Sequence, residues 1–527
     1  MVVAVKRLKI FFLALVSMWM SVAVAQTARP RLVVTIAIDG LQPDHLAALT
    51  NRFDKGGFRK LTEGVALPAT QCRYVSGGAA TDFASLMTGT WPYYHGIIGE
   101  QRYDFVEDNL VPIVYDGRYH GINSAQNVSP KQLAAGTLAD AVKLNQPKAK
   151  VYAVAFNAAN AVVFGGHTAN AAVWLDDETG RLATTDFYEH GLPPWADKVN
   201  KSATIDNYLR YEWRPLYELG TYQYPAAADN ETAFTQPDER QPLTEQIYRF
   251  KHSPFVNTLM KDLAIRAMRD EKMGVDAFTD FLMVEFTVKL PREQGNALLS
   301  AEKEDIYLRL DKDLRLLLDA IDLSVGLDNT LIVVAGTADE SYSLRHLARN
   351  GMTTGEFNAK RSMALLNAYL MAIYGQGRYV SGYCARHIYL NKSLIEKQHI
   401  DRNELERHVA QFMTEFQGVH NAYTSQEIKM ASGIGTDELS RIRNSAFKAT
   451  CGDVVFTLLP GWVEVNDRNE VVGLPNVRHA NVAVYLSGGG VPRCTLPAAD
   501  ITDIAPTICN LLQIPWPNAA VGRVLSW

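Results

Sequence analysis

The chain has 527 residues, 47% of them hydrophobic, and its 52 basic and 57 acidic side chains give a formal net charge of −5. A chain of this length can bury a sizeable core, as one large domain with insertions or as several smaller domains. It has no basic run, which argues against nucleic-acid binding, and its five scattered cysteines form no C-x-x-C pair, which argues against a cysteine-based zinc site.

Residues 1–25 have the three-part pattern of a secretory signal peptide. Three basic side chains precede an apolar run over residues 10–23, and the small-x-small sequence at residues 22–25 matches a cleavage site before Gln26. The apolar run is short for a membrane-spanning helix, and no later stretch is long and apolar enough to cross a bilayer. We therefore predict an exported, periplasmic protein whose mature chain is residues 26–527; an uncleaved N-terminal anchor is the alternative.

Three apolar runs rich in β-branched residues predict buried strands at residues 32–38, 331–336 and 482–486. Strands that are apolar throughout are typical of a parallel sheet covered by helices on both faces, so we predict an α/β fold. Asp39 follows the first run, and Asp339 and Glu340 follow the second. Because the carboxyl ends of parallel strands share one edge of the sheet, where ligands usually bind, we expect these carboxylates to lie near one another.

The segments between the strands differ in character. Residues 302–321 carry leucines at helical spacing and predict a helix. Residues 175–255 are rich in Pro, Tyr and Asn and predict an irregular insertion, whereas residues 395–447 are polar and predict a mostly helical cap.

The most informative motif lies at residues 74–99, which read YVSGGAATDFASLMTGTWPYYHGIIG. Two other blocks accompany it, AIDG at residues 37–40 and GTADES at residues 336–341. Together they resemble the alkaline phosphatase superfamily, specifically the PafA-type branch near the nucleotide pyrophosphatase/phosphodiesterases. The resemblance spans roughly residues 31–526. It implies a mostly parallel sheet with helices on both faces and added cap segments.

The resemblance also implies two zinc ions, held by Asp and His ligands, and a Thr or Ser nucleophile. Asp39 and Asp339 match two of these ligands, but Ala79 stands at the nucleophile position and Glu340 replaces a His. The window expected to supply an Asp and a His, residues 282–295, contains neither. Val288, Leu290, Arg292 and Gln294 occupy it.

The remaining family positions are also changed. The distant His ligand is replaced by Asn481, and His479, two residues earlier, is a weak substitute because a two-residue offset on a strand moves a side chain by roughly 6–7 Å. Glu100 stands where the family has a phosphate-binding Asn, and residues 157–159 read Asn-Ala-Ala in place of Lys-x-Arg. Because the losses cluster on catalytic positions, we interpret the chain as a degenerate member.

Two interpretations remain for the residual acidic residues. Asp39, Asp82, Asp339 and Glu340 would suit one divalent cation, Mg²⁺ or Ca²⁺ in preference to Zn²⁺, or would only cap turns and helices. We favour capping and expect no cofactor.

Other polar and aromatic side chains near the motif are also ambiguous. Thr81 is a weak candidate for a shifted nucleophile. Glu100 and His167 are weak candidates for substrate contacts. His95 is expected to bond the backbone of its own loop, and the aromatic residues Trp91, Tyr93, Tyr94 and Tyr103 would line a groove or pack in the core.

The functional prediction is therefore an exported pseudophosphatase that binds a ligand or an envelope protein partner. The alternative is an active phosphomonoesterase or phosphodiesterase with a rebuilt single-metal site. An acidic site argues against an anionic substrate unless a cation bridges the two.

Overall fold

A computed structural model describes residues 29–527 except 189–190, 227–233, 236, 292–297, 339–341, 343, 467–470 and 473–480. Several positions considered above fall outside these described residues: the signal peptide at 1–25, Arg292, Gln294, Asp339, Glu340 and His479.

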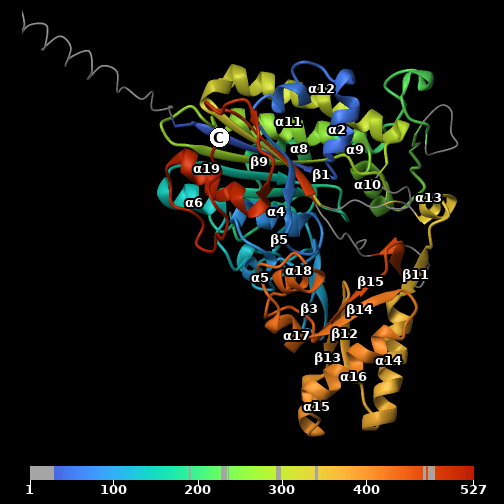
Figure 1. Ribbon diagram of the computed structural model, residues 1–527. Helices are drawn as coiled ribbons and strands as arrows, with labels where there is room; N and C mark the ends of the chain where they lie inside the picture. Colours follow the sequence, from blue (N-terminus) through green and yellow to red (C-terminus); the bar gives the residue numbers. More distant parts are fainter. Residues whose placement is uncertain are drawn as a thin grey trace, which may run out of the picture.

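A large sheet forms the centre of the molecule, with strand order β19-β2-β18-β10-β1-β9-β6-β7-β8-β5 and β20 beside β2 (Figure 1). Its strands are β1 Leu32–Asp39, β2 Val65–Gln71, β5 Gly121–Ile122, β6 Val151–Ala155, β7 Ala171–Leu175, β8 Leu182–Thr185, β9 Asp280–Thr287, β10 Thr330–Gly336, β18 Asn481–Gly488, β19 Cys494–Thr495 and β20 Ala499–Asp500. The central strands β10, β1, β9, β6 and β7 are all parallel, as predicted for a mostly parallel sheet.

The third predicted strand, β18, differs from expectation because it runs antiparallel to β10, with Ala335 opposite Val484. An apolar run buried on both faces does not reveal strand direction, since either direction buries the same side chains. The reversal places Asn481, the first residue of β18, at the same sheet edge as the last residues of β1 and β10.

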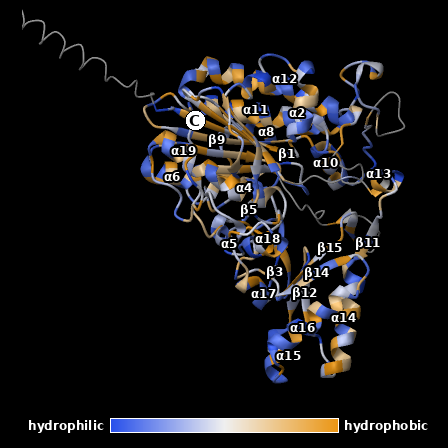
Figure 2. Ribbon diagram, viewed as in Figure 1, coloured by the Kyte–Doolittle hydropathy of each residue, from blue (hydrophilic) through white to orange (hydrophobic). Residues whose placement is uncertain are grey.

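Helices cover both faces of the sheet, which confirms the predicted layers. Along β1, Val34 and Ile36 belong to one apolar core and Val33 and Ala37 to the other. The first core is covered by α2 Pro43–Leu49, α3 Phe58–Leu61, α8 Pro194–Asn200, α9 Thr204–Leu209, α10 Leu243–Lys251, α11 Pro254–Asp270 and α12 Ala301–Ser324. The second is covered by α4 Ala79–Thr88, α6 Leu138–Asn145, α7 Ala158–Gly165 and α19 Ile504–Leu512. Coloured by hydropathy, the central strands between these helices are largely hydrophobic (Figure 2).

Two segments have more regular structure than their sequences suggested. Residues 175–255 include β8 and the helices α8, α9 and α10, whose apolar faces pack on the first core. The predicted helical cap at residues 395–447 contains α15 Lys392–Lys397, α16 Arg402–Thr414, α17 Ser425–Met430 and α18 Glu438–Ser445, but also β14 Val419–Thr424. Composition missed β14, because its side chains are mostly half-buried and polar.

The cap segment is part of a larger lobe that extends away from the main sheet (Figure 1). One lobe sheet has the order β12-β13-β15-β14, and a second has the order β11-β16-β17. The remaining elements there are β11 Gly355–Asn358, α14 Ala359–Tyr374, β12 Val380–Cys384, β13 His387–Leu390, β15 Val454–Leu458, β16 Trp462–Val465 and β17 Val471–Val472. The other short elements are α5 Pro92–His95, the hairpin β3 Gln101–Asp104 and β4 Asn109–Pro112, and α13 Leu344–Arg349.

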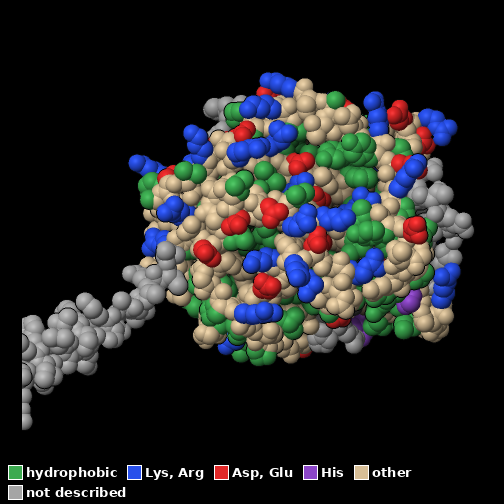
Figure 3. All heavy atoms as spheres, turned by 90° about the horizontal axis from the view of Figure 1, so that it is seen from above, with side chains coloured by type: hydrophobic (Ala, Val, Ile, Leu, Met, Phe, Trp, Pro, Cys, Tyr) green, Lys and Arg blue, Asp and Glu red, His purple; other side chains and the backbone are tan. Residues whose placement is uncertain are grey.

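Within the described part of the chain, no helix combines the length and apolarity needed to span a bilayer. On the face shown in Figure 3, Lys and Arg side chains are interspersed with Asp and Glu. That face therefore offers no basic surface of the kind that binds nucleic acid.

Candidate functional site

The helix α4 begins at Ala79, directly after two glycines that its loop requires. Gly78 has a φ of +119°, and a Cβ at Gly77 would lie 2.0 Å from the carbonyl oxygen of Ile98. The loop is thereby pressed against residues 97–99 and presents position 79 at the start of the helix. Ala79 offers only a methyl group there, and it packs against the second apolar core.

The side chain of Glu100 lies over this same helix start. A Cβ built on Gly78 would stand 3.4 Å from Oε1 of Glu100. A carboxylate is stabilised at the N-terminus of a helix by the unpaired backbone amides and the helix dipole. It also repels a phosphate group, so the chain supplies its own anion where the family binds a phosphoryl group.

Asp39, at the end of β1, is paired with a lysine. The ammonium Nζ of Lys289 lies 2.9 Å from its Oδ1, and both side chains are 16% exposed. The hydroxyl of Thr337 donates to the same oxygen at 2.8 Å. The carboxylate to which the resemblance assigns a metal is thus paired with a cation that belongs to the chain.

Asp82, on the first turn of α4, is fully buried and hydrogen-bonded through both oxygens. The Tyr74 hydroxyl donates to Oδ1 at 2.9 Å, and the backbone amide of Ala338 donates to Oδ2 at 2.8 Å. Asp39 and Asp82 therefore bind two adjacent residues of the segment that follows β10, Thr337 and Ala338. The expected gathering of carboxylates at this sheet edge includes both of them, although Asp339 and Glu340 are not described.

Glu285 is a buried carboxylate within β9 that sequence reasoning did not single out. It accepts the backbone amide of Phe156 at 2.8 Å and the side-chain amide of Asn160 at 2.6 Å. Burial, reinforced by the nearby Asp39, raises its pKa to about 8. The signal was available in the sequence, because a charged residue within an otherwise apolar strand needs a partner.

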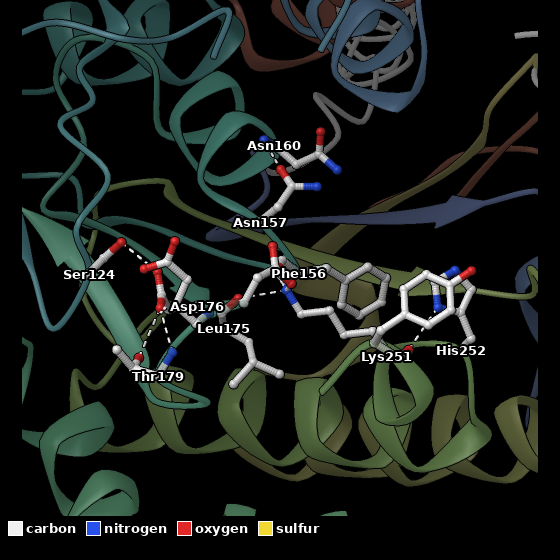
Figure 4. A network of polar contacts seen from close by, with 12 residues as sticks. Ser124, Phe156, Asn157, Asn160, Leu175, Asp176, Thr179, Lys251 and His252 are labelled. Atoms are coloured by element: carbon white, nitrogen blue, oxygen red, sulfur yellow. Dashed lines mark hydrogen bonds and ion pairs between the residues drawn. The ribbon is translucent and has the colours of Figure 1, made fainter. Parts of the chain in front are cut away.

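The segment that follows β6, where the resemblance places Lys-x-Arg, now caps a helix. Asn157 is the N-cap of α7, and its side-chain oxygen accepts the amide of Asn160 at 2.9 Å. The nearest described lysine in this network, Lys251, is turned to the backbone. Its Nζ donates to the carbonyl oxygens of Phe156 and Leu175 at 2.6 and 2.7 Å and to Asp177 at 2.6 Å (Figure 4).

The same close-up shows how the loop after β7 is held. Asp176 accepts the Ser124 hydroxyl through one carboxylate oxygen and the amide and hydroxyl of Thr179 through the other (Figure 4). The carboxylate of Asp176 therefore stabilises the loop that follows β7.

The histidines of the family motifs also make structural contacts. His95 is fully buried, which lowers its pKa to about 3, and its Nδ1 accepts the backbone amide of Ile97, as expected. Its Nε2 lies 3.0 Å from the hydroxyl of Ser85. Because Nδ1 accepts, the ring proton is on Nε2, and the ring cannot take a proton from Ser85.

His167 uses both ring nitrogens within the protein. Nδ1 lies 2.9 Å from Asp140 and Nε2 lies 3.0 Å from the carbonyl oxygen of Leu133. The hydrogen bond to Asp140 raises the pKa of this imidazole. The geometry favours a structural role, and substrate contact by His167 stays a prediction.

Thr81 and the aromatic residues differ in exposure. Thr81 is fully buried, whereas Tyr94 is 41% exposed. The rings of Tyr93 and Tyr94 meet edge to face, and Tyr103 stacks on Tyr389 of the lobe. Tyr93 and Tyr94 therefore pair with each other, and Tyr103 packs against the lobe; a groove lined by these rings stays a prediction.

The expected metal ligands Asp339 and Glu340 lie outside the described residues. Among the residues that are described, no three His, Cys, Asp or Glu side chains are grouped so as to hold a metal. Val288 and Leu290, in the window of the missing ligands, are buried apolar residues. Lys289 stands between them in the same window, and the family's ligand pattern of Asp and His does not predict a role for a lysine there.

Comparisons with known proteins agree with this fold. Residues 33–481 match the family model for type I phosphodiesterase / nucleotide pyrophosphatase. The chain is 29% identical to a protein of Myroides odoratus named calcium-transporting ATPase, with 94% of each chain covered. It is 28% identical to alkaline phosphatase PhoV of Synechococcus elongatus, covering 95% of this chain and 93% of PhoV.

Among solved structures, wild-type alkaline phosphatase PafA superimposes with a TM-score of 0.83 at 25% identity, over 94% of this chain and 98% of PafA. The similarity therefore extends over nearly the whole length of both chains.

Proposed function

The chain belongs to the type I phosphodiesterase/nucleotide pyrophosphatase family of the alkaline phosphatase superfamily, and we propose that it is an exported pseudophosphatase. In this proposal it binds a small ligand or an envelope partner at the former active-site cleft and the adjoining lobe. It does not hydrolyse phosphate esters.

The observation that carries the proposal is the 2.9 Å ion pair between Lys289 and Asp39. A divalent cation bound at Asp39 would face the lysine ammonium at close range, and like charges at such a distance repel strongly in a partly buried site. The same site lacks a nucleophile, because position 79 is alanine. Both observations support the proposed loss of the attacking group and of the electrophilic assistance that phosphoryl transfer requires.

The direct test combines metal analysis with a turnover assay on the full-length mature protein. We expect less than one tightly bound zinc, magnesium or calcium ion per chain. We also expect no hydrolysis of p-nitrophenyl phosphate or bis-p-nitrophenyl phosphate beyond the rate of the Asp39→Asn variant. A stoichiometric metal ion together with turnover that Asp39→Asn abolishes would overturn the proposal.

A second variant separates the nucleophile from the metal site. Ala79→Thr restores a hydroxyl at the first residue of α4 without altering the Lys289–Asp39 pair. We expect it to remain inactive with added zinc, because the metal ligands are still missing. Recovery of zinc-dependent turnover in this single variant would show that only the nucleophile had been lost.

A further inference from the structure

A cavity of about 310 Å³ lies where the lobe meets the loop before α4. One side is formed by Gly77 and Glu100, beside the former nucleophile position, and the other by the β12–β13 hairpin and by Glu464 of β16. A second cavity of about 430 Å³ shares Tyr383 and Glu464 with it. Each of the two cavities is by itself large enough to fall within the size range of small-molecule sites.

The most unusual group in the cavity wall is the carboxylate of Glu464. Its side chain is only 6% exposed, and among the described residues its Oε2 has no hydrogen-bond partner. Burial raises the pKa of this carboxyl, against the opposing influence of Tyr383 and Arg386. Glu464 lines the cavity, and its buried Oε2 is an acceptor without a donor. A ligand with a hydrogen-bond donor would complete it after a rotation of the side chain that turns this oxygen to the cavity.

The hairpin that faces Glu464 is held in a strained backbone conformation. Cys384 pairs with His387 across the hairpin, so Ala385 and Arg386 form a two-residue turn, with φ values of +45° and +70°. Such turns favour Gly, Asn or Asp, and strained non-glycine residues cluster at ligand sites. The turn places Arg386, 8% exposed, in the cavity wall.

The charges in the wall favour a positive ligand. Among its described lining residues, Glu100 and Glu464 are acidic and Arg386 is basic. His387 adds no charge near neutral pH, because burial lowers its pKa to about 4 and its Nδ1 accepts the amide of Gly452. The stacked rings of Tyr383 and Phe456 also line the cavity, and aromatic faces attract organic cations.

We propose that this cavity binds a small organic molecule through its ammonium group, with Glu464 as the counter-ion. A bare metal ion fits less well, because calcium and magnesium need six or more oxygen ligands and the described wall contributes two carboxylates. The inference deepens the proposed ligand-binding function and rests on it. Metal content and turnover test the loss of catalysis, whereas the experiment below tests only the cavity.

The test is a titration by ligand-observed NMR with n-butylammonium chloride and with 1-butanol, its neutral counterpart of similar shape. We expect the wild-type protein to bind butylammonium at least tenfold more tightly than butanol. In the Glu464→Gln variant that preference should disappear, with butylammonium binding weakened at least tenfold. Glu356→Gln, on the paired strand β11 and exposed, is the matched control and should bind as the wild type does.

Equal binding of the two probes by the wild type would overturn the proposal, as would a Glu464→Gln variant that still prefers butylammonium. No detectable binding of butylammonium at millimolar concentration would overturn it as well. The wild-type comparison of the two probes decides the matter even if Glu464→Gln does not fold, which near-ultraviolet circular dichroism would report.

Discussion

One lysine changes the character of the family's metal edge. Lys289 follows β9, the neighbour of β1, so its side chain reaches the carboxylate at the end of β1. Its ammonium brings a fixed positive charge, whereas a metal ion would have to be taken from solution and stripped of water. The ion pair therefore balances the charge of Asp39 with a side chain of the same protein.

At this residue scale we predict that Lys289→Met lowers the free energy of unfolding by about 2 kcal/mol, because Asp39 is left as an uncompensated, largely buried charge. Urea denaturation measures the change.

The matched control is Lys201→Met, which removes a lysine paired with Asp197 but 74% exposed. Its effect should stay within about 0.5 kcal/mol, as for other surface ion pairs. If Lys289→Met is no more destabilising than this control, then the pair with Asp39 contributes nothing to the fold.

At the scale of elements, the side chain of Lys251 links α10 to the edge of the sheet by hydrogen bonds. Lys251, the last residue of α10, donates to the carbonyl oxygens that follow β6 and end β7 (Figure 4). These carbonyls lie at the carboxyl ends of parallel strands, where the next strand cannot satisfy them. The ammonium of Lys251 donates the hydrogen bonds that a neighbouring strand would otherwise supply to these carbonyl oxygens. These bonds fix the C-terminal end of α10 against the sheet.

We predict that Lys251→Met destabilises the protein by about 2–3 kcal/mol, because two carbonyl oxygens lose their donor in a site where Lys251 is only 10% exposed. Urea denaturation measures the change. Lys198→Met, whose side chain is 69% exposed, serves as the control with an expected effect below about 0.5 kcal/mol. Equal effects of the two variants would contradict the role assigned to Lys251.

At the scale of the whole molecule, buried ionisable groups couple stability to pH. The pKa of Glu285 is about 8 in the folded chain, above its ordinary 4.5. Between these values the folded chain holds a proton that the unfolded chain releases. The contribution of Glu285 to stability is therefore present at low pH and is lost as pH rises through about 8.

We predict that the free energy of unfolding of the wild type falls, relative to that of Glu285→Gln, by about 2 kcal/mol between pH 6 and pH 8. Urea denaturation across this range gives the difference, and the contribution of His167, present in both proteins, cancels. Glu396→Gln, at an exposed position, should run parallel to the wild type. Parallel curves for Glu285→Gln and the wild type would show that Glu285 is ionised throughout.

Much of the architecture could be predicted from the residues alone. The apolar runs over β1, β10 and β18 and the ordered motifs around them define buried strands and the family fold, since burial on both faces imposes an apolar pattern that is visible in sequence. The missing nucleophile at Ala79 is visible in the same way, because it is the absence of one residue type at one position.

The direction of β18, the lobe strand β14 and the partners of the charged groups required the tertiary structure. Lys289 and Asp39 are 250 residues apart in the chain, and Glu285 of β9 accepts a hydrogen bond from Asn160 of α7. The hydrophobic pattern of the sequence indicates whether a side chain is buried. Which charged side chains pair depends on which strand ends and helices lie next to one another in the fold. The sequence thus determined the fold and the alanine at position 79, and the three-dimensional packing decided which side chains pair with Asp39, Asp82 and Glu285.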